Sequence, residues 1–268
     1  MIIKSKKKVY AQFHKYQGTG NDFIIIDNRG SKFPRRDSEL IKKLCNRHFG
    51  IGADGLILLQ KKVDYDFEMV YYNADGKESS MCGNGGRCVV EYARTLGLVK
   101  TKANFYAIDG EHWAEIKQKN ISLKMNNVYD IEINEGHYFL NTGSPHYVKF
   151  VDNIEKFNVL EDGRNIRYNE RFKKAGTNVN FVEKDYNELF VRTYERGVEG
   201  ETLSCGTGVT AAALVAALKN VSTSQTTCEI KTLGGHLKVK FKKHSNHSFT
   251  DIWLEGPVQL VFSGEVEI

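Results

Sequence analysis

The stretch ETLSCGTGVTAAA, residues 201–213, places Cys205 directly before a Gly-x-Gly step and an alanine-rich segment of helical character. A cysteine at such a junction lies beside the unpaired backbone N–H groups and the positive end of the helix. That position lowers the pKa of a thiol and makes its sulfur reactive. The stretch therefore predicts a loop-to-helix turn that carries a functional cysteine.

A second copy of this pattern occurs 123 residues earlier. Residues 78–85, ESSMCGNG, and residues 201–208, ETLSCGTG, share the pattern Glu-[Ser/Thr]-x-x-Cys-Gly-x-Gly, and a segment of helical pattern follows each. A looser similarity joins residues 18–23, GTGNDF, to residues 176–181, GTNVNF. Internal repeats of this kind indicate repeated structural units. We expect two similar halves, with Cys82 and Cys205 each at a helix N-terminus.

Most of the chain alternates polar and apolar residues with period two, which is typical of half-buried strands. The clearest examples are residues 105–108, 121–125, 188–192, 237–241 and 251–254. Helical pattern is confined to residues 38–48, with Asp37 or Ser38 as the N-cap, and to residues 86–96 and 209–219. The pattern predicts an α/β chain in which strands outnumber helices.

Length and composition describe an ordinary globular protein of one large or two modest domains: 268 residues, 41% hydrophobic and 26% charged. The net charge of +5 owes much to lysines at residues 4–8 and 240–243, which are typical of a solvated tail and a strand edge. Nucleic-acid binding is therefore a weak hypothesis. Five cysteines are too few for a disulfide scaffold, and no stretch resembles a signal peptide or a membrane span. We expect a cytoplasmic protein with no membrane partner.

Each Cys-Gly-x-Gly turn has the parts of an anion site, because glycines let the backbone come close and the first helical N–H groups point outward. Two thiols from two similar halves suit the removal of a proton from one face of a carbon and the return of a proton to the other. This predicts a racemase or an epimerase. No lysine motif clearly marks a pyridoxal Schiff base, and the residues alone leave such a cofactor open.

The five cysteines also allow other interpretations. Cys45, Cys88 and Cys228 fit small buried hydrophobic residues, because each lies in or beside an apolar-periodic segment. The chain has no Cys-x-x-Cys pair, so a zinc site is not expected. The Gly83-x-Gly85 step lacks the spacing of a dinucleotide-binding loop. A redox protein whose paired thiols form a disulfide stays an alternative.

The chain resembles the diaminopimelate epimerase family, whose members interconvert LL- and meso-diaminopimelate without a cofactor, in lysine and cell-wall precursor biosynthesis. The resemblance covers nearly the whole chain after the lysine-rich start. It is carried by an ordered set of motifs: residues 20–23 (GNDF), 73–76 (NADG), 81–88 (MCGNGGRC), 144–146 (SPH), 194–197 (YERG) and 204–208 (SCGTG).

The resemblance implies a role for each matching residue. Cys82 and Cys205 would transfer protons, with His146 and Glu195 helping to hold their protonation states. The backbone N–H groups that would bind the reacting carboxylate are those of Gly83, Asn84, Gly206 and Thr207. The side-chain amides of Asn21, Asn73 and Asn178 would bind substrate. The guanidinium of Arg196, beside Glu195, would pair with the distal carboxylate. Taken singly, these residues also fit surface ion pairs, turns and a structural histidine.

Proline and hydroxyproline racemases resemble this pattern too, but their substrate has no distal amino-acid group for Glu195 and Arg196. Three positions depart from many relatives: Ser144 stands where asparagine is common, Gly55 where glutamine is common, and the segment between Arg196 and Cys205 is one residue longer. The expected partner is diaminopimelate, and a homodimer is left open.

The resemblance also implies the fold: α+β, with two pseudo-symmetric domains, each a mostly antiparallel sheet wrapped around a central helix. We expect residues 10–126 plus 258–268 to form the half that carries Cys82, and residues 127–257 the half that carries Cys205. The active site would lie in the cleft between them. The last strand, from residue 258 onward, would return to the first half.

Overall fold

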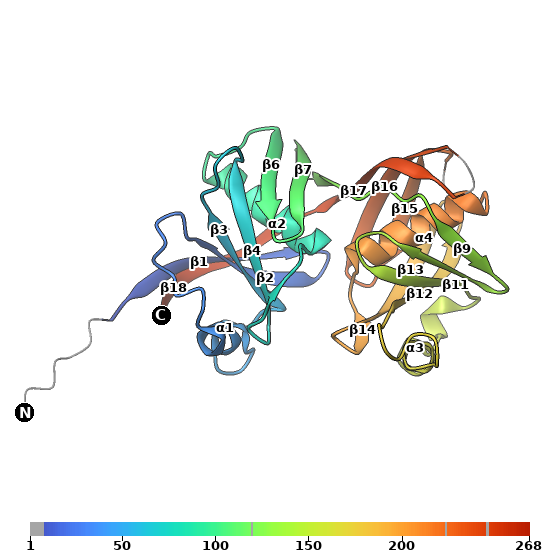
Figure 1. Ribbon diagram of the computed structural model, residues 1–268, viewed down its shortest axis with the longest axis horizontal. Coiled ribbons are helices and arrows are strands. Elements are labelled where there is room, and N and C mark those ends of the chain that lie inside the picture. Colours follow the sequence, from blue (N-terminus) through green and yellow to red (C-terminus); the bar gives the residue numbers. More distant parts are fainter. Residues whose placement is uncertain (1–7, 119, 223, 245–246) are drawn as a thin grey trace, which may run out of the picture. The chain divides into compact units, whose positions relative to one another are not determined.

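The computed structural model describes residues 8–118, 120–222, 224–244 and 247–268 (Figure 1). The chain divides into two compact units. The first unit holds the described residues up to Gly18, then Asp22–Trp113 and Val258–Ile268; the second holds Thr19–Asn21 and Ala114–Pro257. Residues 4–7 of the lysine-rich start lie outside the described part of the chain.

The first unit is a mixed sheet with two helices. Its elements are β1 (Tyr10–Gly18), β2 (Asn21–Asp27), α1 (Ser38–Cys45), β3 (Gly55–Gln60), β4 (Phe67–Asn73), β5 (Glu78–Ser79), α2 (Gly83–Thr95), β6 (Lys102–Ala107) and β18 (Gln259–Glu267), with β7 (Gly110–Lys117) crossing to the second unit. Strand β2 runs parallel to β3, and β4 pairs antiparallel with β3 and β5 and parallel with β6. Strand β18 pairs antiparallel with β1 along its length.

The second unit repeats this plan with more strands. Its elements are β8 (Asn120–Lys124), β9 (Ile131–Asn134), β10 (His137–Asn141), β11 (Pro145–Phe150), the 3-10 helix η1 (Ile154–Lys156), α3 (Val159–Arg167), β12 (Asn178–Asp185), β13 (Glu188–Glu195), β14 (Gly200–Thr202), α4 (Gly206–Leu218), β15 (Thr227–Thr232), β16 (Gly235–Lys243) and β17 (Phe249–Pro257). Strand β11 runs parallel to β12, and β13 pairs antiparallel with β12 and β14 and parallel with β15. Antiparallel pairs join β15 to β16, β16 to β17, and β17 to β8.

The two units share one topology at the same spacing in sequence. In the first unit Phe23 of β2 pairs with Gly55 of β3, and in the second His146 of β11 pairs with Asn178 of β12, each 123 residues later. The helices that follow, α2 and α4, are both 13 residues long. The predicted α+β fold with two similar halves is confirmed. The looser similarity of residues 18–23 to 176–181 is not part of this match, because β2 corresponds to β11 and not to β12.

Both central helices are buried, and the sequence of α4 has no polar face at all. Eleven of the 13 residues of α4 are buried among strands β10–β13 and β15–β17, and a helix that is apolar all round belongs in a core. Helix α2 contacts β1, β3 and β4 and buries ten of its residues. Both helices begin three residues earlier than predicted, at Gly83 and Gly206. The prediction placed the starts too late because the first turns are rich in glycine, which has low helix propensity.

The two shorter helices show a success and a failure of the sequence pattern. Asp37 caps α1 as predicted, since its carboxylate accepts a hydrogen bond from the backbone N–H of Leu40 at 2.9 Å. Helix α3 was not predicted. Gly163 interrupts its pattern, yet packing requires glycine there, because a Cβ atom would lie 2.4 Å from Cβ of Tyr194.

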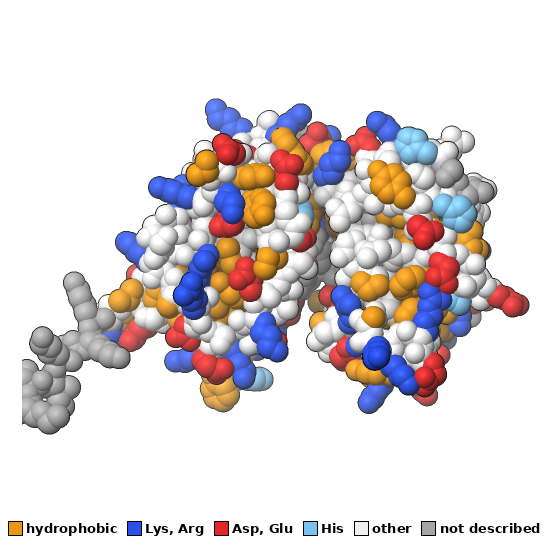
Figure 2. Space-filling view, viewed as in Figure 1, with side chains coloured by type: hydrophobic (Ala, Val, Ile, Leu, Met, Phe, Trp, Pro, Cys, Tyr) orange, Lys and Arg blue, Asp and Glu red, His pale blue; other side chains and the backbone are white. Residues whose placement is uncertain are grey.

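The contact units differ from the expected ranges in two places. Residues 114–118 and 120–126 lie in the second unit, where β8 pairs with β17. Residues 19–21 also lie there: Thr19 donates to the hydroxyl of Ser204 at 3.0 Å, and Gly20 packs against Leu203. On the face shown in Figure 2, basic and acidic side chains are interspersed over each unit. Within the described residues, no helix has the length and apolar character needed to cross a membrane.

Candidate active site

The Cys205 turn is a helix start whose thiol faces a hydroxyl. Cys205 is the N-cap of α4 with an extended backbone, φ −119° and ψ 111°, and 7% of its surface is exposed. Its Sγ lies 3.6 Å from Oγ1 of Thr207. Thr142, from the loop before β11, donates to the backbone oxygen of Thr207 at 2.8 Å. The loop that leads to His146 is thereby fixed against this turn.

The Cys82 turn has the same geometry at the start of α2. Cys82 is the N-cap, φ −91° and ψ 131°, and is partly exposed, while Gly83 and Asn84 are buried. The backbone N–H of Met81 donates to the carboxylate of Asp109 at 3.2 Å. In both units, then, a cysteine precedes a buried helix whose first N–H groups can bind an anion.

A buried arginine distinguishes the first turn from the second. Arg87 is fully buried and curls back toward the start of α2, where its Nη2 donates to Oδ1 of Asn84 at 2.9 Å and its Nη1 to the backbone oxygen of Gly83 at 3.4 Å. Burial lowers the pKa of Arg87, and the Coulomb interactions with Cys88 and, to a smaller extent, Cys82 oppose that shift. The matching residue of α4 is Thr210, whose hydroxyl donates to the backbone oxygen of Gly206 at 2.9 Å. One helix start therefore carries a cation and the other a neutral hydroxyl.

His146 belongs to a buried network of neutral polar groups. Asn180 donates through Nδ2 to Nδ1 of His146 at 3.1 Å and to the backbone oxygen of Tyr147 at 2.9 Å. Its Oδ1 accepts from the hydroxyl of Thr193 at 3.0 Å. His146 is fully buried, and burial, together with the charge of Arg196, lowers its pKa to about 3. The imidazole is therefore neutral near neutral pH.

Asn178, Glu195 and Arg196 lie close together at the ends of β12 and β13. Oδ1 of Asn178 accepts from the backbone N–H of Arg196 at 2.9 Å, and its Nδ2 donates to the backbone oxygen of Pro145 at 3.2 Å. The Arg196 side chain is exposed and donates to the backbone oxygen of Ala175 at 3.0 Å. Glu195 accepts from the hydroxyl of Thr202 on β14 at 2.9 Å. A cation on an exposed arm suits a carboxylate ligand.

The predicted residues thus fall into two groups, one in each unit. The second unit brings together the Cys205 turn, the loop before His146, and the segment that ends at Asn21. The first holds the Cys82 turn and Asn73, which ends β4 and is exposed. These come from neighbouring strands, because β4 pairs with β5 three residues before Cys82.

Two further polar residues were not among the predicted ones. Asn180 and Thr193 hold His146, yet they lie 34 and 47 residues beyond it in sequence. The repeat could have revealed Asn180, because the equivalent residue of the first half is the apolar Ile57.

Gly55, the departure from many relatives, has a packing cause. A Cβ atom there would lie 2.5 Å from both Cε2 of Tyr71 and the backbone oxygen of Tyr72. The ring of Tyr71 therefore occupies the space into which a longer side chain at residue 55 would extend.

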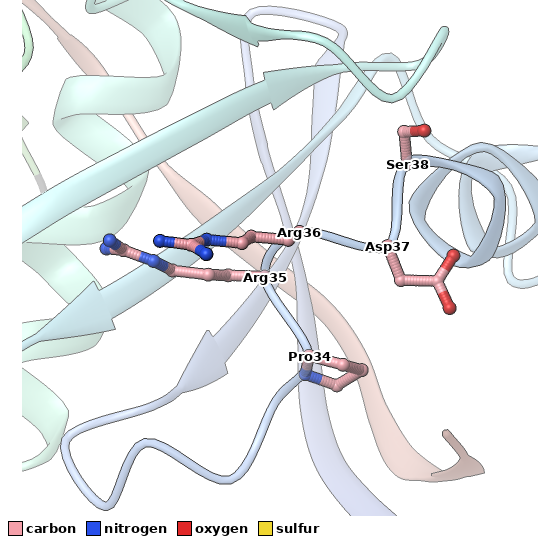
Figure 3. A pocket seen from close by; sticks show the side chains of 5 residues that line it. All are labelled: Pro34, Arg35, Arg36, Asp37 and Ser38. Carbon is pink, nitrogen blue, oxygen red and sulfur yellow. The ribbon is translucent and has the colours of Figure 1, made fainter.

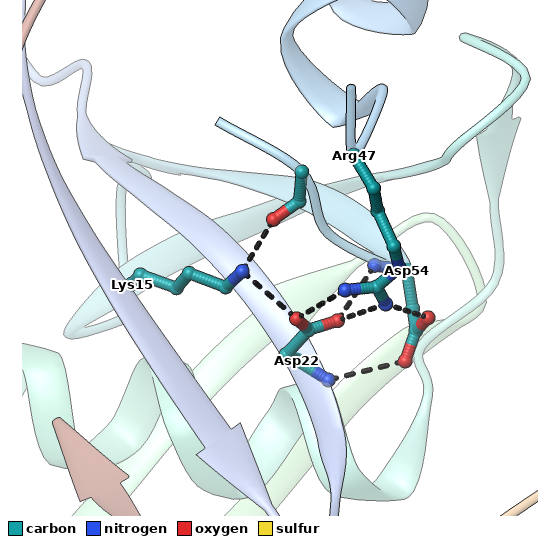
Figure 4. A network of polar contacts seen from close by, with 5 residues as sticks. Lys15, Asp22, Arg47 and Asp54 are labelled. Atoms are coloured by element: carbon teal, nitrogen blue, oxygen red, sulfur yellow. Dashed lines mark hydrogen bonds and ion pairs between the residues drawn. The ribbon is translucent and has the colours of Figure 1, made fainter. Parts of the chain in front are cut away.

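An ion-pair network holds the start of β2 next to Asn21 (Figure 4). The carboxylate of Asp22 contacts Nζ of Lys15 at 2.9 Å and both terminal nitrogens of Arg47 at 2.9 and 2.8 Å. Arg47 also reaches Asp54 at 2.7 Å. Burial alone would raise the pKa of Asp22, but the bonds from Arg47 and Lys15 outweigh it and lower the pKa to about 2. The network therefore fixes the position of Asp22, the residue that directly follows Asn21.

A surface hollow lies apart from these residues in sequence, in the loop before α1 (Figure 3). Pro34, Arg35, Arg36, Asp37 and Ser38 line it. Asp37 is already used as the N-cap of α1, and the hollow contains none of the predicted site residues.

Comparison with known proteins extends the match from short motifs to most of the chain. The profile of the family described as "Diaminopimelate epimerase" matches residues 13–130 and 138–261. A protein of Flavobacterium psychrophilum named diaminopimelate epimerase is 52% identical over 253 residues, covering 94% of this chain and 98% of that protein. One of the same name from Chlorobaculum tepidum is 41% identical over 262 residues, covering 94% and 99%.

Solved structures share the fold at low identity. A PhzF-family phenazine biosynthesis protein of Bacillus anthracis has a TM-score of 0.74 at 15% identity, covering 97% of this chain and 100% of that chain. A probable proline racemase of Agrobacterium radiobacter has a TM-score of 0.70 at 14% identity, covering 96% and 92%. These likenesses bear on the fold alone. The family profile and the two close relatives span nearly the full sequence, and this chain belongs to the diaminopimelate epimerase family.

Proposed function

We propose that this protein interconverts LL- and meso-diaminopimelate by moving a proton at one α-carbon, without a cofactor. The observation that carries the proposal is the repeated turn: Cys82 and Cys205 cap matching buried helices in a chain that is 52% identical to a named diaminopimelate epimerase. The chain has only five cysteines, an odd number and too few for a disulfide scaffold, so we place the activity in the cytoplasm.

In the proposed reaction one cysteine begins as thiolate and the other as thiol. The thiolate removes the α-hydrogen as a proton and becomes a thiol, leaving a carbanion beside the carboxylate. The second thiol then gives its proton to the opposite face of that carbon and becomes the thiolate. The stereocentre is inverted, atoms and charge balance, and the two cysteines have exchanged states.

The helix starts supply the stabilisation that this carbanion needs. Negative charge spreads from the α-carbon onto the carboxylate as the proton leaves. Backbone N–H groups of Gly83, Asn84, Gly206 and Thr207 are preorganised donors for such oxygens, and fixed donors stabilise developing charge better than water does. We assign the reacting carboxylate to these groups.

The remaining predicted residues would select the substrate. The exposed guanidinium of Arg196 would pair with the distal carboxylate in a two-point contact, beside Glu195. Asn21, Asn73 and Asn178 would bind polar groups of the substrate. Asn178 already holds the backbone of Arg196, so this asparagine also orients the arginine.

The test is incubation of reduced protein with LL-diaminopimelate in deuterium oxide, followed by chiral separation and mass spectrometry. We expect meso product with one solvent deuteron at the inverted carbon, and loss of turnover in Cys82→Ser and in Cys205→Ser. Near-normal turnover in either variant would refute the two-thiol scheme. Isomerisation of proline instead would favour a racemase, and disulfide cycling without isomerisation would favour a redox protein.

A further inference from the structure

The polar network around His146 occupies a place where the other unit of the same fold has mainly aromatic and aliphatic side chains. Because β11–β13 repeat β2–β4, the residues that match His146, Asn180 and Thr193 in the first unit are Phe23, Ile57 and Tyr71. The strand registers agree: Ile57 pairs with Tyr71, and Asn180 pairs with Thr193.

The equivalent glycines of the two central helices pack against these two sites. A Cβ atom added to Gly85 of α2 would lie 3.2 Å from Ile57 and 3.3 Å from Phe23, whose ring packs edge-on against Tyr71 at 5.9 Å. A Cβ atom added to Gly208, the matching glycine of α4, would lie 2.3 Å from Oδ1 of Asn180. A buried polar network costs free energy unless every group is satisfied. Since the first unit has Phe23 and Ile57 where the second has His146 and Asn180, the fold itself does not require polar side chains there, and these polar residues point to function.

The hydrogen bonds of Asn180 fix its orientation without ambiguity. The backbone oxygen of Tyr147 can only accept, so the group that contacts it is the NH2 end of the amide. The same NH2 therefore also donates to Nδ1 of His146. Nδ1 must then carry a lone pair, and the single proton of the neutral ring must lie on Nε2. Nε2 is buried and has no hydrogen-bond partner among the described residues.

We propose that Asn180 is a positioning residue that holds the imidazole of His146 in the Nε2–H tautomer, so that His146 presents a fixed hydrogen-bond donor to an anion of the reaction. This inference rests on the proposed function. It assigns His146 the stabilisation of an anion, either a cysteine thiolate or the carboxylate of the substrate. It denies His146 the role of base, because Nδ1 is engaged with Asn180 and Nε2 already carries a proton.

The tautomer can be read directly by NMR. In protein labelled with 15N-histidine, two-bond 1H–15N correlations distinguish a ring protonated on Nε2 from one protonated on Nδ1. The signal that is missing from His146→Gln identifies His146 among the eight histidines. We expect the Nε2–H pattern in the full-length wild-type protein. An Nδ1–H pattern would overturn the proposal.

Two substitutions at residue 180 then test the function of the tautomer. Asn180→Asp keeps the shape but presents a carboxylate, which accepts from the ring; we expect an Nδ1–H tautomer and a kcat lower by about 10- to 100-fold, with a smaller change in KM. Asn180→Ile copies Ile57 of the first unit and should remove the tautomer preference. Phe181→Leu is the matched control, because its side chain leaves the opposite face of β12 and enters a separate core cluster. It should lower stability without changing the tautomer.

An Asn180→Asp protein that keeps the Nε2–H pattern, or that reverses the tautomer and keeps wild-type kcat, would refute the proposal. If Asn180→Ile fails to fold, the wild-type and Asp spectra still decide. His146→Gln has no imidazole ring and serves only for assignment. A wild-type protein that does not epimerise diaminopimelate would refute the proposed function, while the tautomer measurement would stand unaffected.

Discussion

The paired glycines Gly85 and Gly208 allow one substitution to be compared in two matching environments. Both residues are the third of their helices, and both lie three residues beyond a candidate catalytic cysteine. Replacing each with alanine adds the same methyl group. We expect Gly85→Ala to leave the protein as stable as the wild type or slightly more stable, and Gly208→Ala to destabilise it.

The magnitudes follow from what each methyl group would contact. Alanine gains about 1 kcal/mol over glycine in a helix at either site. At residue 85 the nearest atoms are the side-chain ends of Ile57, Phe23 and Met69 at 3.2–3.4 Å, so small shifts relieve the contact. At residue 208 the Cβ atom would lie 2.3 Å from Oδ1 of Asn180, which must move. Losing two or three buried hydrogen bonds costs about 2–4 kcal/mol, so the net destabilisation is about 1–3 kcal/mol.

Thermal unfolding followed by circular dichroism measures the difference. For a chain of this size about 1 kcal/mol shifts Tm by about 2–4 °C, so Gly208→Ala should melt at least several degrees below Gly85→Ala. Turnover supplies a second reading, since a displaced Asn180 releases His146. Equal Tm values, or a higher Tm for Gly208→Ala, would refute the view that Asn180 is held tightly against α4.

Three further predictions use other parts of the molecule. Gly55→Gln should lower the free energy of unfolding by about 1–3 kcal/mol, because its Cβ atom would lie 2.5 Å from the backbone oxygen of Tyr72. Urea titration should show a lower midpoint, and an unchanged midpoint would contradict this packing. Asp22 has a pKa of about 2 when folded against an ordinary value of 3.8. Its ion pairs should therefore add about 2 kcal/mol above pH 4 that disappears as the pH falls through 2, and Asp22→Asn should lose stability at pH 6 but not at pH 2 in urea titrations. Iodoacetamide should label Cys82 before Cys205, since Cys82 is the more exposed and has a buried cation in its helix; mass spectrometry showing the reverse order would exclude this asymmetry.

The sequence predicts local features of this fold well, because they depend on local patterns. Period-two alternation locates strands such as β8, β16 and β17, and the repeated Cys-Gly-x-Gly turn locates both central helices. Helix α3 escapes because Gly163 serves a contact with Tyr194, which is distant in sequence. Residues 18–23 and 176–181 are similar in sequence but do not occupy equivalent strands of the two units. Sequence similarity over six residues does not determine which strands correspond.

The candidate site divides in the same way. The two cysteines and their turns are visible as a repeat, and the resemblance to the family adds His146, Glu195 and Arg196. Asn180 requires the strand register, because only the pairing of β12 with β11 and β13 shows that it holds His146. The reason for glycine at residue 55 likewise depends on a neighbouring strand, because the ring of Tyr71 on β4 lies where a side chain would extend.

The pairing of β1 with β18 has a consequence for synthesis on the ribosome. Tyr10 faces Glu267 in this pair, so the first unit lacks an edge strand until the residues of β18 have emerged. The second unit needs only residues 19–21 and 114–257, and all of these leave the exit tunnel earlier. Contacts between distant residues also form slowly. The second unit should therefore mature first, and the N-terminal residues of the first unit would wait, with an open strand edge, for β18 to close it.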